Sequence, residues 1–168
     1  RISTYGIEAY MEILSWNLKG EKSAKDALVG WMNKPERNET VVCVQEWFKY
    51  GEQRIDEISS IDADIRKQTN DKFSAVAMNS NDNASVFIFV AQVVMGTPTN
   101  IQGERFCVAE ISIISDRYAP LFVLNFHGVS RYSKPLPGSR TLRMTRVINQ
   151  MKMALKKKSK RIIMIGDW

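Results

Sequence analysis

Four short apolar runs in this chain each end in a polar side chain, and this pattern constrains the fold more than any other feature of the sequence. The runs have the length and branching of buried strands, and the last of them leads directly into Gly-Asp. Active sites in open α/β sheets form at the ends of strands, where side chains are held rigidly at the edge of the sheet. The four side chains are Asn17, Glu46, His127 and Asp167.

Hydrophobic periodicity along the chain predicts alternating strands and helices. Strands are expected over residues 11–16, 40–45, 73–78, 85–95, 106–114, 121–126 and 162–165, with antiparallel neighbours in the middle of the chain. Amphipathic helices are expected over residues 24–32, 53–61 and 144–155, and a loop over residues 96–103. Elements in this order predict a layered α/β fold. A chain of 168 residues normally forms one domain, here residues 1–168.

Two further features bound the class of protein. No apolar run approaches the length of about 20 residues that crosses a bilayer, and the sequence does not indicate a cellular location. Cys43 and Cys107 lie inside strand-like runs, so they are predicted to be buried free thiols, with a single disulfide as the alternative.

Charge is distributed unevenly along the chain. The span from Arg117 to Gly166 holds twelve Lys or Arg residues and no Asp or Glu, whereas the rest of the chain has twelve basic and eighteen acidic residues. Such asymmetry favours a polyanionic partner, such as nucleic acid or an anionic membrane surface. For residues 156–160 alone, a solvated basic end of a helix is the favoured explanation of the charge.

Together, the four strand-end residues have the functional groups that phosphodiester hydrolysis requires. Asn and Glu oxygens suit Mg²⁺, an Asp can orient an attacking water, and a His can stabilise or protonate the developing oxyanion. The arginines Arg105, Arg131 and Arg140 are candidates for contacts with phosphate oxygens. Taken singly, each residue also has a structural explanation: Asn17 in a turn, Glu46 in an ion pair, His127 in the core and Asp167 as a cap.

The motifs around these residues resemble those of the endonuclease/exonuclease/phosphatase superfamily, which has a deoxyribonuclease I-like fold. The matching segments are Ile-Leu-Ser-Trp-Asn-Leu-Lys-Gly from residue 13, Val-Cys-Val-Gln-Glu from residue 42, Leu-Asn-Phe-His from residue 124 and Ile-Gly-Asp from residue 165. The Trp-Asn-Leu-x-Gly segment most resembles the catalytic subunit of cytolethal distending toxin. Each motif is short, but their number and order make the resemblance specific.

This resemblance implies a four-layer α-β-β-α sandwich and divalent-metal-dependent cleavage of phosphodiesters, most simply of DNA by an endonuclease. Asn17 and Glu46 would hold the metal, Mg²⁺ with Mn²⁺ or Ca²⁺ as alternatives, and His127 and Asp167 would be catalytic. Resemblance to the toxin would further imply secretion and delivery subunits. Alternatives are a phosphatase or phosphodiesterase acting on lipid or inositol phosphates, and a catalytically inactive domain that binds nucleic acid or a protein.

The sequence departs from the superfamily pattern at its end. The Asn of the Gly-Asp-x-Asn motif would be the next residue, and the later Asp-His pair of the superfamily has no counterpart, since the chain contains one His. We therefore expect these residues to be the N-terminal part of a longer enzyme, with the C-terminal part of the fold incomplete.

Overall fold

A computed structural model describes residues 11–49, 55–81, 84–103, 105–113, 121–128, 139–156 and 161–167. The strands are β1 (Glu12–Asn17), β2 (Thr40–Gln45), β3 (Phe73–Asn81), β4 (Ala84–Ala91), β5 (Val94–Gly103), β6 (Phe106–Ile113), β7 (Leu121–His127) and β8 (Ile162–Asp167). The helices are α1 (Lys22–Met32), α2 (Ile55–Gln68) and α3 (Ser139–Leu155).

The strands form two four-stranded sheets that mirror each other in their pairing. The first has the order β1-β2-β4-β3 and the second β5-β6-β7-β8. Each sheet has one parallel pair at an end, β1 with β2 and β7 with β8, while the other neighbours are antiparallel. The antiparallel pairing predicted for the middle of the chain is confirmed.

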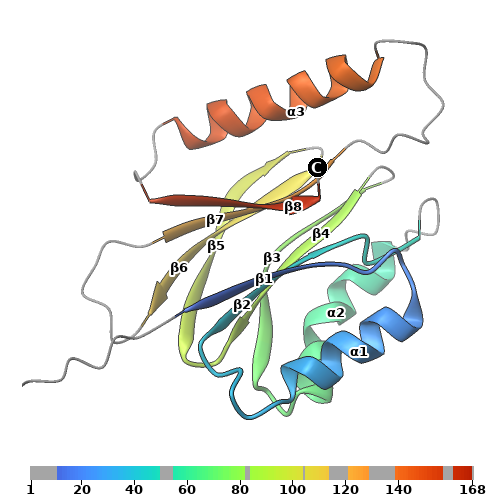
Figure 1. Ribbon diagram of the computed structural model, residues 1–168, viewed down its shortest axis with the longest axis vertical. Coiled ribbons are helices and arrows are strands. Elements are labelled where there is room, and N and C mark those ends of the chain that lie inside the picture. The colour runs from blue at the N-terminus through green and yellow to red at the C-terminus, as the bar shows by residue number, and fades with distance from the viewer. Residues whose placement is uncertain are drawn as a thin grey trace, which may run out of the picture.

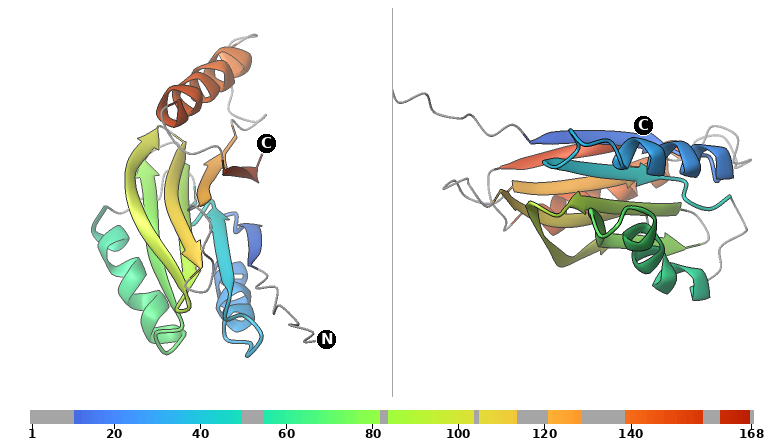
Figure 2. Two further views of the ribbon diagram at one scale, coloured as in Figure 1. Left: turned by 90° about the vertical axis from the view of Figure 1, so that its left-hand side faces the viewer. Right: turned by 90° about the horizontal axis from the view of Figure 1, so that it is seen from below.

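Three apolar layers hold the sheets and helices together as a four-layer α-β-β-α sandwich. Helices α1 and α2 cover the outer face of the first sheet, and α3 covers the outer face of the second (Figures 1 and 2). Alternation along β2 explains the layering, because Val42 and Val44 pack towards the helices while Val41 and Cys43 pack between the sheets. The predicted fold class is confirmed.

Several of the predicted elements are wrong at their ends or in type. The single strand predicted over residues 85–95 is divided between β4 and β5, which lie in different sheets, and α3 begins at Ser139 rather than at residue 144. Residues 96–103 are not a loop but most of β5, which pairs with β6. The register shifts between Pro98 and Gln102, as expected where a proline cannot donate to a neighbouring strand, and β5 tolerates this at the edge of its sheet. Helix α2 continues past Ile61 to Gln68, because Ile65 repeats the buried position one turn later.

Both cysteines are buried and free, as predicted. They lie in the layer between the sheets, where burial raises the pKa of each thiol above its usual value. Within the described part of the chain, no helix has both the length and the apolar character needed to span a membrane.

Candidate active site

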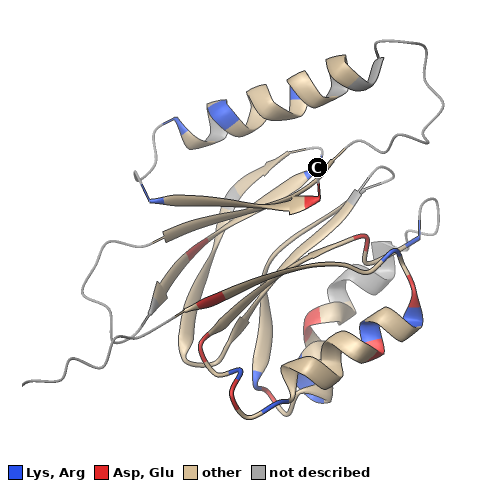
Figure 3. Ribbon diagram, viewed as in Figure 1, with Lys and Arg blue, Asp and Glu red and all other residues tan. Residues whose placement is uncertain are grey.

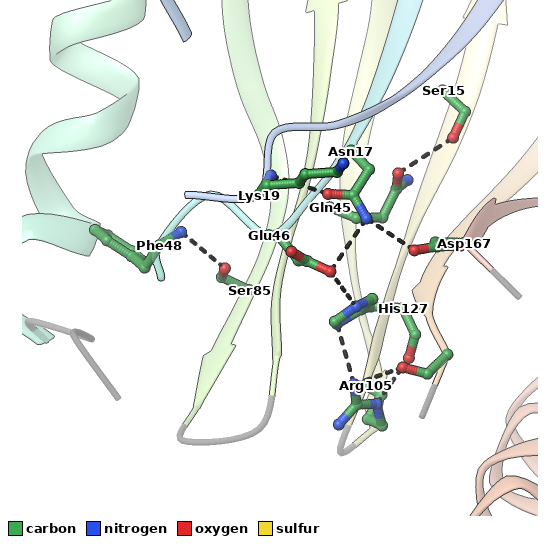
Figure 4. A network of polar contacts seen from close by, with 11 residues as sticks. Ser15, Asn17, Lys19, Gln45, Glu46, Phe48, Ser85, Arg105, His127 and Asp167 are labelled. Atoms are coloured by element: carbon green, nitrogen blue, oxygen red, sulfur yellow. Dashed lines mark hydrogen bonds and ion pairs between the residues drawn. The ribbon is translucent and has the colours of Figure 1, made fainter. Parts of the chain in front are cut away.

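The four predicted strand-end residues meet at one edge of the sandwich. Asn17 ends β1, Glu46 follows β2, and His127 and Asp167 end β7 and β8. His127 and Asp167 are direct partners in the parallel register of β7 and β8. Because the two parallel pairs lie against each other across the middle layer, the carboxyl ends of four strands converge, two from each sheet (Figure 4).

The alternation of side chains places three of these residues at the mouth of the layer between the sheets. Side chains two or four residues apart on a strand point to the same face of the sheet. Asn17, His127 and Asp167 are related in this way to Ile13, Val123 and Ile165, which belong to or pack against the apolar core between the sheets. If β2 continued as a regular strand, Glu46 would point to the other face, towards the helices, like Val42 and Val44. Instead it has a positive φ of 53°, a strained conformation for a residue other than glycine, and its side chain lies beside His127 (Figure 4).

Gly166 allows β8 to bring Asp167 to the site. Its φ is +154°, and a Cβ built there would lie 2.0 Å from the carbonyl oxygen of Phe126 on β7. Only glycine permits this approach without displacing the strand. The backbone beyond it is also fixed, because the Gly128 N–H donates a 2.6 Å hydrogen bond to the Asp167 carbonyl oxygen.

The four side chains form one hydrogen-bonded network. Asn17 Nδ2 donates to Glu46 Oε1 over 3.1 Å and to Asp167 Oδ2 over 2.8 Å, so one amide joins two carboxylates from different sheets. Its Oδ1 accepts from the Lys19 backbone N–H at 2.9 Å. Glu46 Oε1 also lies 2.9 Å from His127 Nε2. The cluster that sequence analysis predicted is therefore assembled.

The electrostatics of the site keep Glu46 ionised. The hydrogen bond from His127 lowers the pKa of the Glu46 carboxyl most strongly, while partial burial opposes this shift. The hydrogen bond from Asn17 and the positive charge of Lys19 lower the pKa further. A carboxylate that stays charged at neutral pH is available as a ligand for a cation.

The donor set fits a small divalent cation. Polar atoms of Glu46, His127 and Asp167 lie within 4.8 Å of one another, and the two carboxylates among them are groups that hard cations prefer. Asn17 presents its NH₂ group rather than its oxygen to the carboxylates, so its amide would have to turn over to ligate a metal. Its role as a ligand stays a prediction.

The predicted phosphate-contacting arginines are placed unequally. Arg105 lies at the site but is buried, with its guanidinium against His127 and Gly128. Arg140 is the second residue of α3, and its side chain lies outside the described part of the structure; Arg131 lies outside the described residues altogether. Their contacts with phosphate remain predictions.

Sequence analysis missed a buried amide pair beneath the site. Gln45 Nε2 donates to Asn125 Oδ1 over 2.6 Å, and Asn125 Nδ2 donates to the carbonyl oxygens of Val44 and Phe87 at 2.8 and 2.9 Å. These bonds join the two sheets one or two residues before Glu46 and His127. The signal was present, because a polar residue inside an apolar strand is costly to bury without a partner.

Comparisons with known proteins support the fold, but sequence comparison does not assign the chain to a family. No protein-family model and no curated protein sequence matches the chain. Crystal structures of TDP2 from Caenorhabditis elegans match it in structure, with TM-scores of 0.53 for the selenomethionine form and 0.52 for a second form, each at 14% identity. The matches cover 94% and 96% of this chain.

A truncated form of the same nematode protein matches with a TM-score of 0.52, also at 14% identity, over 92% of this chain. The chain spans about half the length of the structures that it matches, with 46%, 50% and 60% of those chains covered. At this level of identity the likeness shows a shared fold, the deoxyribonuclease I-like sandwich predicted from the sequence motifs.

Proposed function

We propose that this chain provides the catalytic centre of a divalent-metal-dependent phosphodiesterase, acting most simply as an endonuclease on DNA. The observation that carries the proposal is the convergence of Asn17, Glu46, His127 and Asp167 from four strand ends into one hydrogen-bonded network. The likeness in fold to TDP2 supports the same reading. We also propose that residues 1–168 belong to one domain, because the middle core joins both sheets.

The residues of the site have two proposed roles: two of them bind the cation, and the other two act on the attacking water and on the phosphate. Glu46 and, after its amide turns, Asn17 would hold Mg²⁺, with Mn²⁺ or Ca²⁺ as substitutes. A bound divalent ion supplies Lewis-acid polarisation of a phosphoryl oxygen. Asp167, exposed at the end of β8, would orient the attacking water, and His127 would direct a hydrogen bond at the charge that develops on the phosphate.

Charge near the second sheet supports a polyanionic substrate. Helix α3 contains no acidic residue, and its described side chains Arg146 and Lys152, together with Lys156 after its end, are exposed. Figure 3 shows basic residues without acidic ones along α3, in contrast to the mixed charges around α1 and α2. Neutralising backbone phosphates by Lys and Arg is the main sequence-independent source of affinity for DNA.

Nicking of supercoiled plasmid DNA tests the proposal. We expect the complete protein to nick the plasmid with Mg²⁺ but not with EDTA, and we expect Glu46→Gln and Asp167→Ala each to lower the rate at least about 100-fold. Asp64→Asn is the matched control, since Asp64 is an exposed carboxylate on α2, and it should cleave like the parent. Nicking that survives Asp167→Ala would refute the assignment of the site.

Parallel assays separate the alternative substrates. Release of phosphate or phosphocholine from lipid or inositol phosphates without plasmid nicking would replace the endonuclease reading with that of a lipid or inositol phosphatase or phosphodiesterase. Salt-sensitive DNA binding without turnover would indicate an inactive binding domain. Secretion and delivery subunits of the distending-toxin type rest on the Trp-Asn-Leu-Lys-Gly segment alone.

A further inference from the structure

Arg105 is wrapped around the end of β7 immediately behind the site. Its Nε donates to the His127 carbonyl oxygen at 2.8 Å, and its Nη2 donates to the Gly128 carbonyl oxygen at 2.6 Å. The same Nη2 lies 3.0 Å from His127 Nδ1. In return, the His127 backbone N–H donates to the Arg105 carbonyl oxygen at 2.9 Å. Both side chains are buried, with 8% and 9% of each residue exposed (Figure 4).

The chemistry of arginine decides where the proton of the His127 ring lies. A guanidinium group has only donors, so the Nδ1 atom that faces it must accept and carries no proton. The ring proton is then on Nε2. The neighbour on that side agrees, because an ionised Glu46 carboxylate only accepts, and its Oε1 lies 2.9 Å from Nε2. Two independent contacts on opposite sides of the ring therefore demand the same tautomer.

We propose that Arg105 is a positioning residue that fixes His127 as the neutral Nε2–H tautomer, with this N–H directed into the site. In that state Nε2 has no free lone pair, so it cannot take a proton from the attacking water. It can donate a hydrogen bond to a carboxylate or to a phosphate oxygen. This assigns His127 to stabilising charge on the substrate, and only this last step rests on the proposed function.

The single histidine makes the proposal directly measurable. Long-range ¹H–¹⁵N correlation spectra of the uniformly ¹⁵N-labelled chain contain one imidazole, since the sequence has one His. In the parent chain, we expect Nδ1 to resonate at the frequency of an unprotonated ring nitrogen and Nε2 at that of a protonated one. An Nδ1–H tautomer, or the averaged shifts of a ring that exchanges freely between tautomers, would overturn the proposal.

Three variants show which neighbour sets the tautomer. Arg105→Met keeps an unbranched apolar stem but removes the donors, so the two nitrogen shifts should move towards each other as both tautomers become populated. Glu46→Ala removes the acceptor at Nε2 and should leave the Nδ1 shift unchanged, because Arg105 is still in place. Arg146→Met removes an exposed arginine of α3 and serves as the control, with His127 signals expected at their parent positions.

The results separate a role in orienting the ring from simple support of the strand end. If Arg105→Met folds, as judged by its backbone amide spectrum, and keeps the parent tautomer, the proposal is wrong. If Arg105→Met does not fold, the parent and Glu46→Ala spectra still test the proposal. Loss of the Nε2–H tautomer in Glu46→Ala would show that Glu46, and not Arg105, fixes the tautomer of His127. None of these spectra requires metal, substrate or turnover, so failure of the nicking assay would leave this result standing.

Discussion

Replacing Asn125 by leucine should destabilise the chain by about 3 kcal/mol. Asn125 is fully buried and takes part in three hydrogen bonds that join the two sheets, one from Gln45 and two to the carbonyl oxygens of Val44 and Phe87. Each such bond contributes about 1 kcal/mol net. Leucine has the same number and branching of side-chain heavy atoms, so the substitution removes the hydrogen bonds without leaving a large cavity.

Urea unfolding followed by circular dichroism measures this change, and thermal unfolding should show a fall in Tm of about 6–12 °C for a chain of this size. Ser15→Ala is the matched control, because Ser15 is exposed and donates a single 3.3 Å bond to the same Gln45. It should cost less than about 1 kcal/mol. An Asn125→Leu chain as stable as the parent would show that the amide pair does not hold the sheets together.

Two further predictions concern the strand ends themselves. Gly166→Ala should destabilise the chain by about 2–4 kcal/mol in the same unfolding assay, because its Cβ would overlap the Phe126 carbonyl. Gly30→Ala on α1 is the control: a Cβ there meets nothing within 4 Å, so this substitution should stabilise the chain by about 0.5–1 kcal/mol. Equal effects of the two substitutions on stability would contradict the close approach of β8 to β7. The lowered pKa of Glu46 makes its contribution to stability complete above its unfolded value of 4.5 and lost as pH falls through the lower folded value. Glu46→Gln should therefore flatten the fall in stability below pH 4.5, whereas an unchanged slope would show that Glu46 is not held as an anion by His127 and Asn17.

The site could be predicted from the sequence because its residues occupy equivalent places on different strands. Asn17, Glu46, His127 and Asp167 each follow an apolar run, and parallel pairing brings such positions together without further information. The pattern could not show that Glu46 turns into the site through a positive φ. That conformation is imposed by the surrounding structure and leaves no mark in residue type.

Elements that depend on distant partners were the ones that sequence analysis missed. Gly96, Pro98 and Gly103 are typical of a loop, yet β6 supplies a partner that makes this segment an edge strand. The second half of α2 is mostly polar, so the sequence did not predict that the helix and its apolar face continue to Ile65 and beyond. The contacts of Arg105 with His127 could likewise not be predicted, because the two residues are more than twenty positions apart in the sequence.

Binding of Mn²⁺ at the cluster is the most direct test of a divalent-cation site at these strand ends. Mn²⁺ broadens nearby NMR signals, and the imidazole of His127 is a unique reporter because it is the one histidine of the chain. We predict that Mn²⁺ broadens the His127 ring signals, that excess Mg²⁺ restores them, and that the double variant Glu46→Gln/Asp167→Asn abolishes the effect. His127 signals that stay sharp at saturating Mn²⁺, or that broaden equally in the double variant, would contradict a cation site at these strand ends.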